Sequence, residues 1–224
     1  MPRLHETAYP RLRSTVTDVG LQEIYSSTTE EVAFAEAHTR SETAKVGLLV
    51  LLKTFQRLGY FVTLSAVPRR IIAHLTACAG LSAVPEGLET YDTGHTRSRH
   101  LGVVRARLGI TAYGPAARRA MFTAAVEAAQ TKEDLADIMN VMLEALVRHR
   151  YELPAFSTLE RVAFTARAAV KRRYYQRIAT RLDATISDLP EKVLQTPLVQ
   201  GRLPESRLVD SLRVGSVRGK RSVM

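Results

Sequence analysis

The chain has 224 residues, 46% of them hydrophobic, so it can bury a sizeable core and is not a disordered tail. Its net charge is +10, and 26 of its 32 basic residues are arginine, which favours nucleic acid over a membrane surface as the polyanionic partner. The single cysteine, Cys78, excludes an intrachain disulfide, and no apolar run reaches the roughly 20 residues that span a bilayer.

Hydrophobic periodicity predicts helices along most of the chain, and therefore an all-α fold. The clearest helix is predicted between Thr43 and Tyr60, where apolar residues recur at spacings of three and four. The residues that form this stripe are Leu48, Leu51, Leu52, Phe55 and Leu58. Its opposite face carries Lys53, Gln56 and Arg57. Further helices are predicted at 29–38, 68–80, 96–109, 115–130, 132–150 and 157–183, with Pro68 and Gly80 marking one start and one end.

The stretch at 79–94 is rich in glycine, proline and small polar residues and is typical of a linker. It separates two small helix-turn-helix-like modules, which we expect at 1–80 and 95–150. A basic helix at 151–187 follows, and 188–224 is predicted to be a flexible tail.

Charge is unevenly distributed along the chain. Residues 53–119 carry ten basic and three acidic side chains, and residues 148–182 carry nine and two, so each block has a net charge of +7. The intervening residues 120–147 have a net charge of −4. Two basic blocks separated by an acidic helix predict at least two contact surfaces.

Arginines gather where helices are predicted to begin. If Thr96 is an N-cap, Arg97 and Arg99 lie in a first turn, where a cation opposes the helix dipole. Arg69 and Arg70 follow Pro68 in the same way. A phosphate at these helix starts would explain the cations, since free backbone N–H groups and arginines would then bind one anion.

Other basic residues flank the predicted core face of the 96–109 helix, which consists of Leu101, Val104 and Leu108; they include Arg105 and Arg107. Lys53, Gln56 and Arg57 are candidates to read base edges from a helix lying in a groove. In "VKRRYYQR", Lys171, Arg172 and Arg177 are either phosphate contacts or a solvated helix face.

No catalytic or metal-binding pattern is present. His74 and Cys78 are four residues apart, but no third ligand completes a zinc site. The sequence contains no G-x-S-x-G turn and no glycine-rich phosphate loop. We therefore expect no enzyme activity, no metal and no cofactor.

Four motifs, in order, are "LKTFQRLGYF", "VPRRII", "TRSRHLGVVRARLG" and "LPAFSTLERV". They resemble the N-terminal region of Tn-three-family replicative transposases over about residues 20–185. The resemblance implies successive small modules that bind the transposon's terminal inverted repeats. It assigns Lys53, Arg57, Arg69 and Arg70 to the first module. To the second it assigns Arg97, Arg99, His100, Arg105 and Arg107.

In that family a DDE catalytic domain lies far downstream, and this sequence contains no counterpart. We therefore expect a cytoplasmic protein that binds double-stranded DNA without cleaving it, with full-length transposase as a second partner and no membrane partner. Two other classes remain open. The basic helices could dock an acidic protein, or the chain could be an enzyme whose site the sequence does not reveal, which nicking of supercoiled plasmid would expose.

Overall fold

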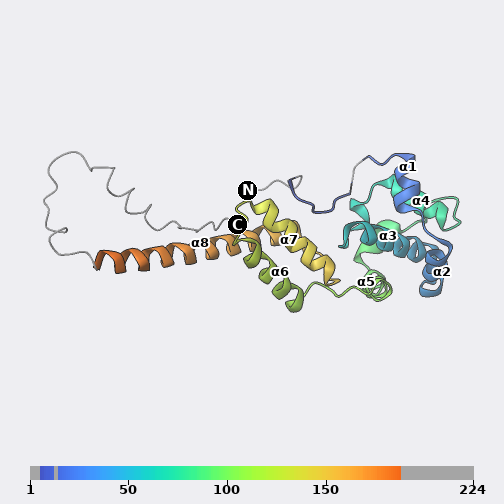
Figure 1. Ribbon diagram of the computed structural model, residues 1–224. Helices are drawn as coiled ribbons and strands as arrows, with labels where there is room; N and C mark the ends of the chain where they lie inside the picture. The colour runs from blue at the N-terminus through green and yellow to red at the C-terminus, as the bar shows by residue number, and fades with distance from the viewer. Residues whose placement is uncertain (1–5, 13–14, 188–224) are drawn as a thin grey trace, which may run out of the picture. The chain divides into compact units, whose positions relative to one another are not determined.

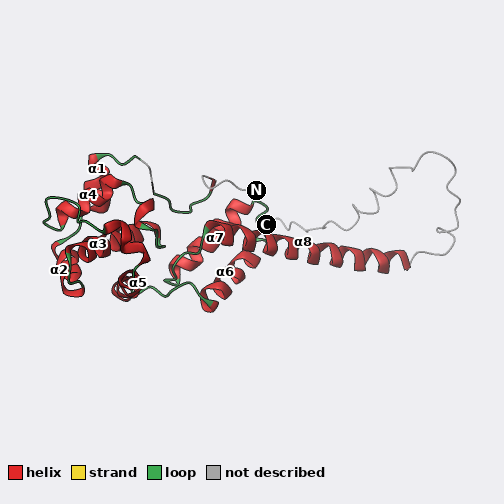
Figure 2. Ribbon diagram, turned by 180° about the vertical axis from the view of Figure 1, so that it is seen from behind, coloured by secondary structure: helices red, strands yellow, loops and turns green. Residues whose placement is uncertain are grey.

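The computed structural model describes residues 6–12 and 15–187, with the backbone alone for residues 182–187. The expected tail at 188–224 lies outside these residues. Every regular element within them is a helix, and the only extended pairing is an isolated bridge between Thr111 and Tyr151 (Figure 2). The predicted all-α fold is confirmed. The chain divides into two compact units, residues 1–174 and residues 175–224.

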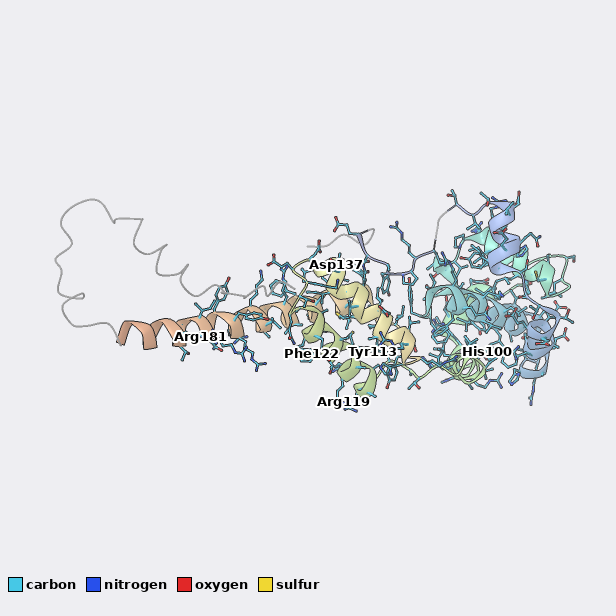
Figure 3. All side chains as sticks on the ribbon, viewed as in Figure 1. His100, Tyr113, Arg119, Phe122, Asp137 and Arg181 are labelled. Carbon is cyan, nitrogen blue, oxygen red and sulfur yellow. The ribbon has the colours of Figure 1, made fainter. Side chains whose placement is uncertain are left out.

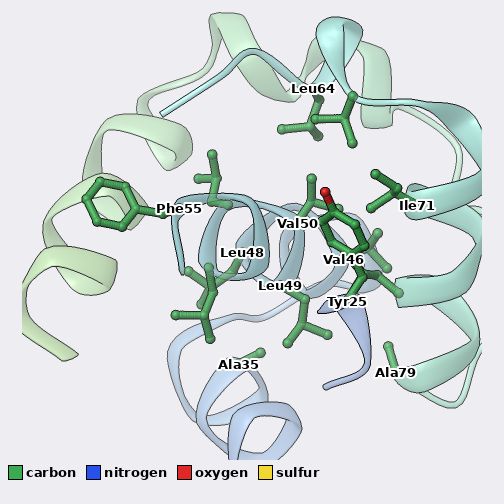
Figure 4. Close-up of a cluster of buried hydrophobic side chains, with 14 of the residues drawn as sticks. Tyr25, Ala35, Val46, Leu48, Leu49, Val50, Phe55, Leu64, Ile71 and Ala79 are labelled. Atoms are coloured by element: carbon green, nitrogen blue, oxygen red, sulfur yellow. The ribbon is translucent and has the colours of Figure 1, made fainter. Parts of the chain in front are cut away.

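The first hydrophobic core is built around α3 (Glu42–Leu58) and includes side chains of α2 (Thr29–His38), α4 (Arg69–Cys78) and α5 (His95–Leu108) (Figure 1). The stripe predicted on α3 is buried, and Leu48, Leu51 and Leu52 have no exposed surface. Figure 4 shows Leu48 of this stripe in one cluster with Tyr25 and Ile71. Gly59 ends α3 in the left-handed conformation, which costs glycine little because it has no Cβ.

Short helices complete the first core. They are α1 (Asp18–Gly20), the π-helical turn η2 (Leu21–Tyr25), and the 3-10 turns η3 (Leu64–Ala66) and η4 (Leu88–Thr93). Leu21, Leu64 and Leu88 are buried in that core. None of these turns has the length that makes helical periodicity visible in a sequence.

The second core joins α6 (Pro115–Ala128), α7 (Leu135–Arg148) and the start of α8 (Phe156–Ser187). Alanines on α6 and α8 let the helices approach closely, and Met121, Met139 and Met142 fill the space between them. Tyr9 of the N-terminal segment is also buried in this core. Its hydroxyl donates a hydrogen bond to the carbonyl of Pro154 at 2.9 Å.

The two cores divide the chain differently from the expected modules. Leu88 and Tyr91 come from the stretch predicted to be a linker, and both are buried in the first core together with Val104 of α5. Tyr91 packs directly on Gly47 of α3, where an added Cβ would lie 2.5 Å from the tyrosine ring. Consequently the helix at 95–108 belongs with residues 16–91, and α6 is the first helix of the second core.

Backbone contacts join the two cores within the first unit. Thr111 donates to the Arg150 carbonyl at 2.9 Å, and Glu152 donates back to the Thr111 carbonyl at the same distance. Leu153 donates to the carbonyl of Gly59 at 2.8 Å, and Tyr9 stacks on Tyr60. These contacts hold the end of α3, the segment after α5 and the segment after α7 together.

Candidate nucleic-acid interface

Lys53 was a candidate for base reading, but the structure places it in the interior. It is 8% exposed, and its Nζ lies 3.1 Å from Oε2 of the buried Glu31. Gln56 donates to Oε1 of the same carboxylate at 2.8 Å. Burial alone would raise the pKa of Glu31, but hydrogen bonds from Gln56, the Thr28 amide and Lys53 together lower it. Lys53 therefore compensates a buried carboxylate and is not available to DNA.

Arg97 and Arg105 are also engaged by carboxylates. The Nε of Arg97 donates to Asp92 at 3.0 Å, and its Nη2 donates to the Val62 carbonyl at 3.1 Å. Arg105 pairs with Glu152 at 2.9 Å, with its guanidinium 5.0 Å from the ring centre of Phe61. Both arginines brace the fold, because each links α5 to a segment distant in sequence. The sequence could not reveal this, since neither carboxylate lies at a helical spacing from its arginine.

His100 has no exposed surface, which corrects its assignment as a DNA contact (Figure 3). Its Nδ1 lies 2.6 Å from the hydroxyl of the buried Tyr91. Burial, and then the charges of Arg99 and His38, lower the pKa of His100 to about 4. The signal was present in the sequence, because His100 precedes the core residue Val104 by four positions.

Arg99 and Arg107 lie on the exposed part of α5 and contact α2. Arg99 donates to the carbonyl of His38, the last residue of α2, at 3.4 Å. The guanidinium of Arg107 lies 4.4 Å from the ring centre of Phe34. A cation at the end of α2 stabilises the helix dipole, so these arginines have a structural use while staying accessible.

Three further candidates lie on α3 and α4, the helices of the first core, with their side chains exposed. Arg57, at the end of α3, and Arg69, at the start of α4, have no carboxylate partner in the described part of the chain. Arg70 pairs with the exposed Asp18 at 2.6 Å and donates to the Val16 carbonyl. Among these residues, Arg57 and Arg69 therefore have no carboxylate that competes with an anion, whereas Arg70 already has one in an exposed ion pair.

The remaining candidates lie on α8. Lys171, Arg172 and Arg177 are exposed, and none has a hydrogen-bond or carboxylate partner among residues 6–12 and 15–181. From Arg161 to Arg181 the sequence contains seven basic residues and no acidic one. The buried stripe of α8 ends at Val170, beyond which every described side chain is exposed.

Sequence reasoning missed further cations of the same kind, among them Arg118, Arg119 and Arg173. Arg173 continues the exposed run on α8, and Arg118 and Arg119 lie exposed on the first half of α6, where Figure 3 labels Arg119. No carboxylate in the described residues pairs with any of them. Arg118 and Arg119 lie three and four residues after Pro115, within reach of a predicted helix start, so a search for arginines near helix starts would have found them.

The starts of the helices fall into two groups. The helices α2, α3 and α7 have a side-chain N-cap and an acidic residue in the first turn. In contrast, α4, α5 and α6 have neither. The expected N-cap Thr96 lies inside α5, which begins after Gly94. Uncapped first turns with nearby arginines favour anions, although Arg97 is already used internally.

The described residues contain neither a group of metal ligands nor a helix that could span a membrane. His74 and Cys78 approach to 3.8 Å, but no group of three His, Cys, Asp or Glu side chains within the described ranges could hold a metal ion. Over the same residues, no helix combines the length and the apolar character needed to cross a membrane.

The fold and these residues define an all-α protein with two hydrophobic cores and an exposed basic helix. The profile of the family described as "Domain of unknown function (DUF4158)" matches residues 3–166, and the chain belongs to this family. No curated protein matches the chain.

Proposed function

We propose that this chain binds double-stranded DNA, chiefly through contacts between exposed cations and the phosphate backbone. The observation that carries the proposal is the run Lys171, Arg172 and Arg173, three exposed and unpaired cations in a stretch of α8 without acidic residues. Successive residues of an α-helix are rotated by about 100°, so these cations point to different sides. A helix lying in a DNA groove needs such an arrangement, because phosphates flank it on both sides.

Two further observations support the proposal. Arg118 and Arg119 add two unpaired cations near the uncapped start of α6. The chain also resembles the inverted-repeat-binding region of Tn-three-family transposases, so terminal inverted repeats are the proposed target. Helix-turn-helix-like base reading, competition with a full-length transposase and binding without cleavage belong to the same proposal.

A triple variant tests the function. Replacing Lys171, Arg172 and Arg173 with glutamine should weaken binding to a 30-base-pair duplex on the order of 100-fold at low salt, because three phosphate contacts are lost. The charge-matched control replaces Arg40, Lys132 and Arg148, which lie on neither α6 nor α8 and of which only Arg148 has a carboxylate partner among the described residues, Glu144 at 3.1 Å. Fluorescence anisotropy measures both affinities. If the two triple variants lose duplex affinity equally, the loss reflects net charge and not a specific role of residues 171–173.

A second candidate function is the docking of an acidic protein. It is favoured by the exposure of Tyr174, Tyr175 and Ile178, which are 46%, 68% and 53% exposed and would suit an apolar contact. Polyglutamate added to the anisotropy assay separates the two functions. A chain that binds polyglutamate as tightly as the duplex, and does not prefer an inverted-repeat duplex to its scrambled version, would be an acidic-partner protein.

A further inference from the structure

A pocket of about 170 Å³ opens beside the end of α3, where the N-terminal segment, η2 and α3 meet. Arg11, Thr15 and Thr17 line it from the N-terminal segment, Tyr25 from η2 and Arg57 from α3. The remaining lining residues are Val16, Gly20 and Ile24. No lining residue is acidic, so the pocket combines two guanidinium groups with three hydroxyl groups and no compensating charge.

Tyr25 is the buried polar side chain of this pocket. The residue is 4% exposed, and its ring packs in the first core with Val46 and Ile71 (Figure 4). Its hydroxyl has no hydrogen-bond partner in the described part of the protein. Burial raises the pKa of Tyr25, and the positive charge of Arg57, which lines the same pocket, acts in the opposite direction. A phenol with a raised pKa stays protonated near neutral pH and can donate a hydrogen bond.

The two arginines differ from the paired cations of the first core. Lys53 and Arg97 each reach a carboxylate within 3.1 Å, whereas Arg11 and Arg57 have none within the described ranges. Both line the same pocket, so their charges repel each other unless an anion lies between them. Folding alone gives no reason to place two uncompensated guanidinium groups beside a buried hydroxyl donor.

We propose that this pocket binds a phosphate group. Arginine matches phosphate with paired N–H donors, and a tetrahedral oxyanion has enough oxygens to accept from two guanidinium groups and the Tyr25 hydroxyl together. Thr15 also lines the pocket and offers a further hydroxyl donor. The phosphate could belong to the DNA backbone or to a small phosphorylated compound, and the same groups would bind it in either case. The pocket does not depend on the DNA-binding proposal, because it uses other residues than α6 and α8.

The test titrates the full chain with inorganic phosphate and with phenyl phosphate, using isothermal titration calorimetry. Tyr25→Phe keeps the packed ring and removes only the hydroxyl, so the fold should be retained, and the melting temperature checks this. We expect Tyr25→Phe and Arg57→Gln each to weaken phenyl phosphate binding about tenfold, since each removes a hydrogen bond to a charged group. Arg40→Gln removes an exposed arginine outside the pocket and should leave the affinity unchanged.

A duplex arm identifies the source of the phosphate. If the DNA backbone supplies it, a 30-base-pair duplex competes with phenyl phosphate, and both pocket variants bind the duplex more weakly. If a small compound supplies it, the variants lose phenyl phosphate affinity and bind the duplex as the wild type does. The proposal is overturned if Tyr25→Phe and Arg57→Gln match the wild type toward both probes. Failure of the α8 triple variant to weaken DNA binding would leave the phenyl phosphate result standing.

Discussion

Tyr91 of η4 and His100 of α5 form a hydrogen-bonded pair, with the tyrosine hydroxyl 2.6 Å from Nδ1 of the imidazole. The imidazole has no exposed surface. Protonating His100 would place a second positive charge beside Arg99 in a site that cannot solvate it. The fold therefore favours the neutral imidazole, and its pKa falls from the ordinary 6.5 to about 4. Because the unfolded chain binds this proton more readily, the contribution of His100 to stability is full above pH 6.5 and is lost as the pH falls toward 4.

The loss of stability at low pH can be measured by comparing the wild type with His100→Gln, whose glutamine side chain does not titrate. Between pH 7 and pH 4.5 the unfolding free energy of the wild type should fall by about 2 kcal/mol more than that of the variant. Urea denaturation at a series of pH values gives both curves. A constant difference between the two proteins across this range would mean that His100 is solvated in the folded state.

At the scale of the element, α7 ends on an unusual residue. Arg150 adopts a left-handed conformation with φ 55°, at the position after the C-cap where glycine is usual. The amide of Arg150 donates to the Val147 carbonyl and that of Tyr151 to the Leu146 carbonyl, which is the Schellman pattern. Its guanidinium reaches the Leu108 carbonyl at 3.1 Å, so the arginine also ties α7 to the end of α5.

Comparing two substitutions at Arg150 isolates its backbone strain. Arg150→Gly and Arg150→Ala both lose the contact with Leu108, but only glycine adopts positive φ without steric cost, so Arg150→Gly should be more stable by about 1 kcal/mol. At Arg148, the last residue of α7, the backbone is helical, so the order should reverse, by at most about 1 kcal/mol, because alanine favours helix. Chemical denaturation measures all four variants, and the same order at both sites would contradict the left-handed assignment.

Local sequence signals predicted most helices but not their tertiary packing. Periodicity and caps located α2 through α8 because those signals act within a few residues. They could not reveal that Tyr91 packs on Gly47, or that Lys53 faces Glu31 from within a nominally polar face. The candidates Lys53, Arg97 and Arg105 failed for the same reason, since whether a cation is paired depends on a carboxylate from another segment.

For the whole molecule, the 32 basic residues overstate the number of cations that DNA can use. Lys53, Arg97 and Arg105 are paired internally and release no counterions on binding. On α6 and α8, six candidate cations have no partner in the described part of the chain. They are Arg118, Arg119, Lys171, Arg172, Arg173 and Arg177. If each contacts one phosphate, the number of contacts is about six, whatever the total charge of the chain.

Six phosphate contacts predict a slope of about −5 for the logarithm of the duplex binding constant against the logarithm of salt concentration. The Lys171, Arg172 and Arg173 triple variant should reduce this slope to about −3, because each lost contact removes about 0.9. The control variant at Arg40, Lys132 and Arg148 should keep the wild-type slope. Anisotropy titrations at salt concentrations from about 50 to about 300 mM measure the slope. A flat dependence, or an unchanged slope in the triple variant, would exclude α8 as the phosphate-binding element.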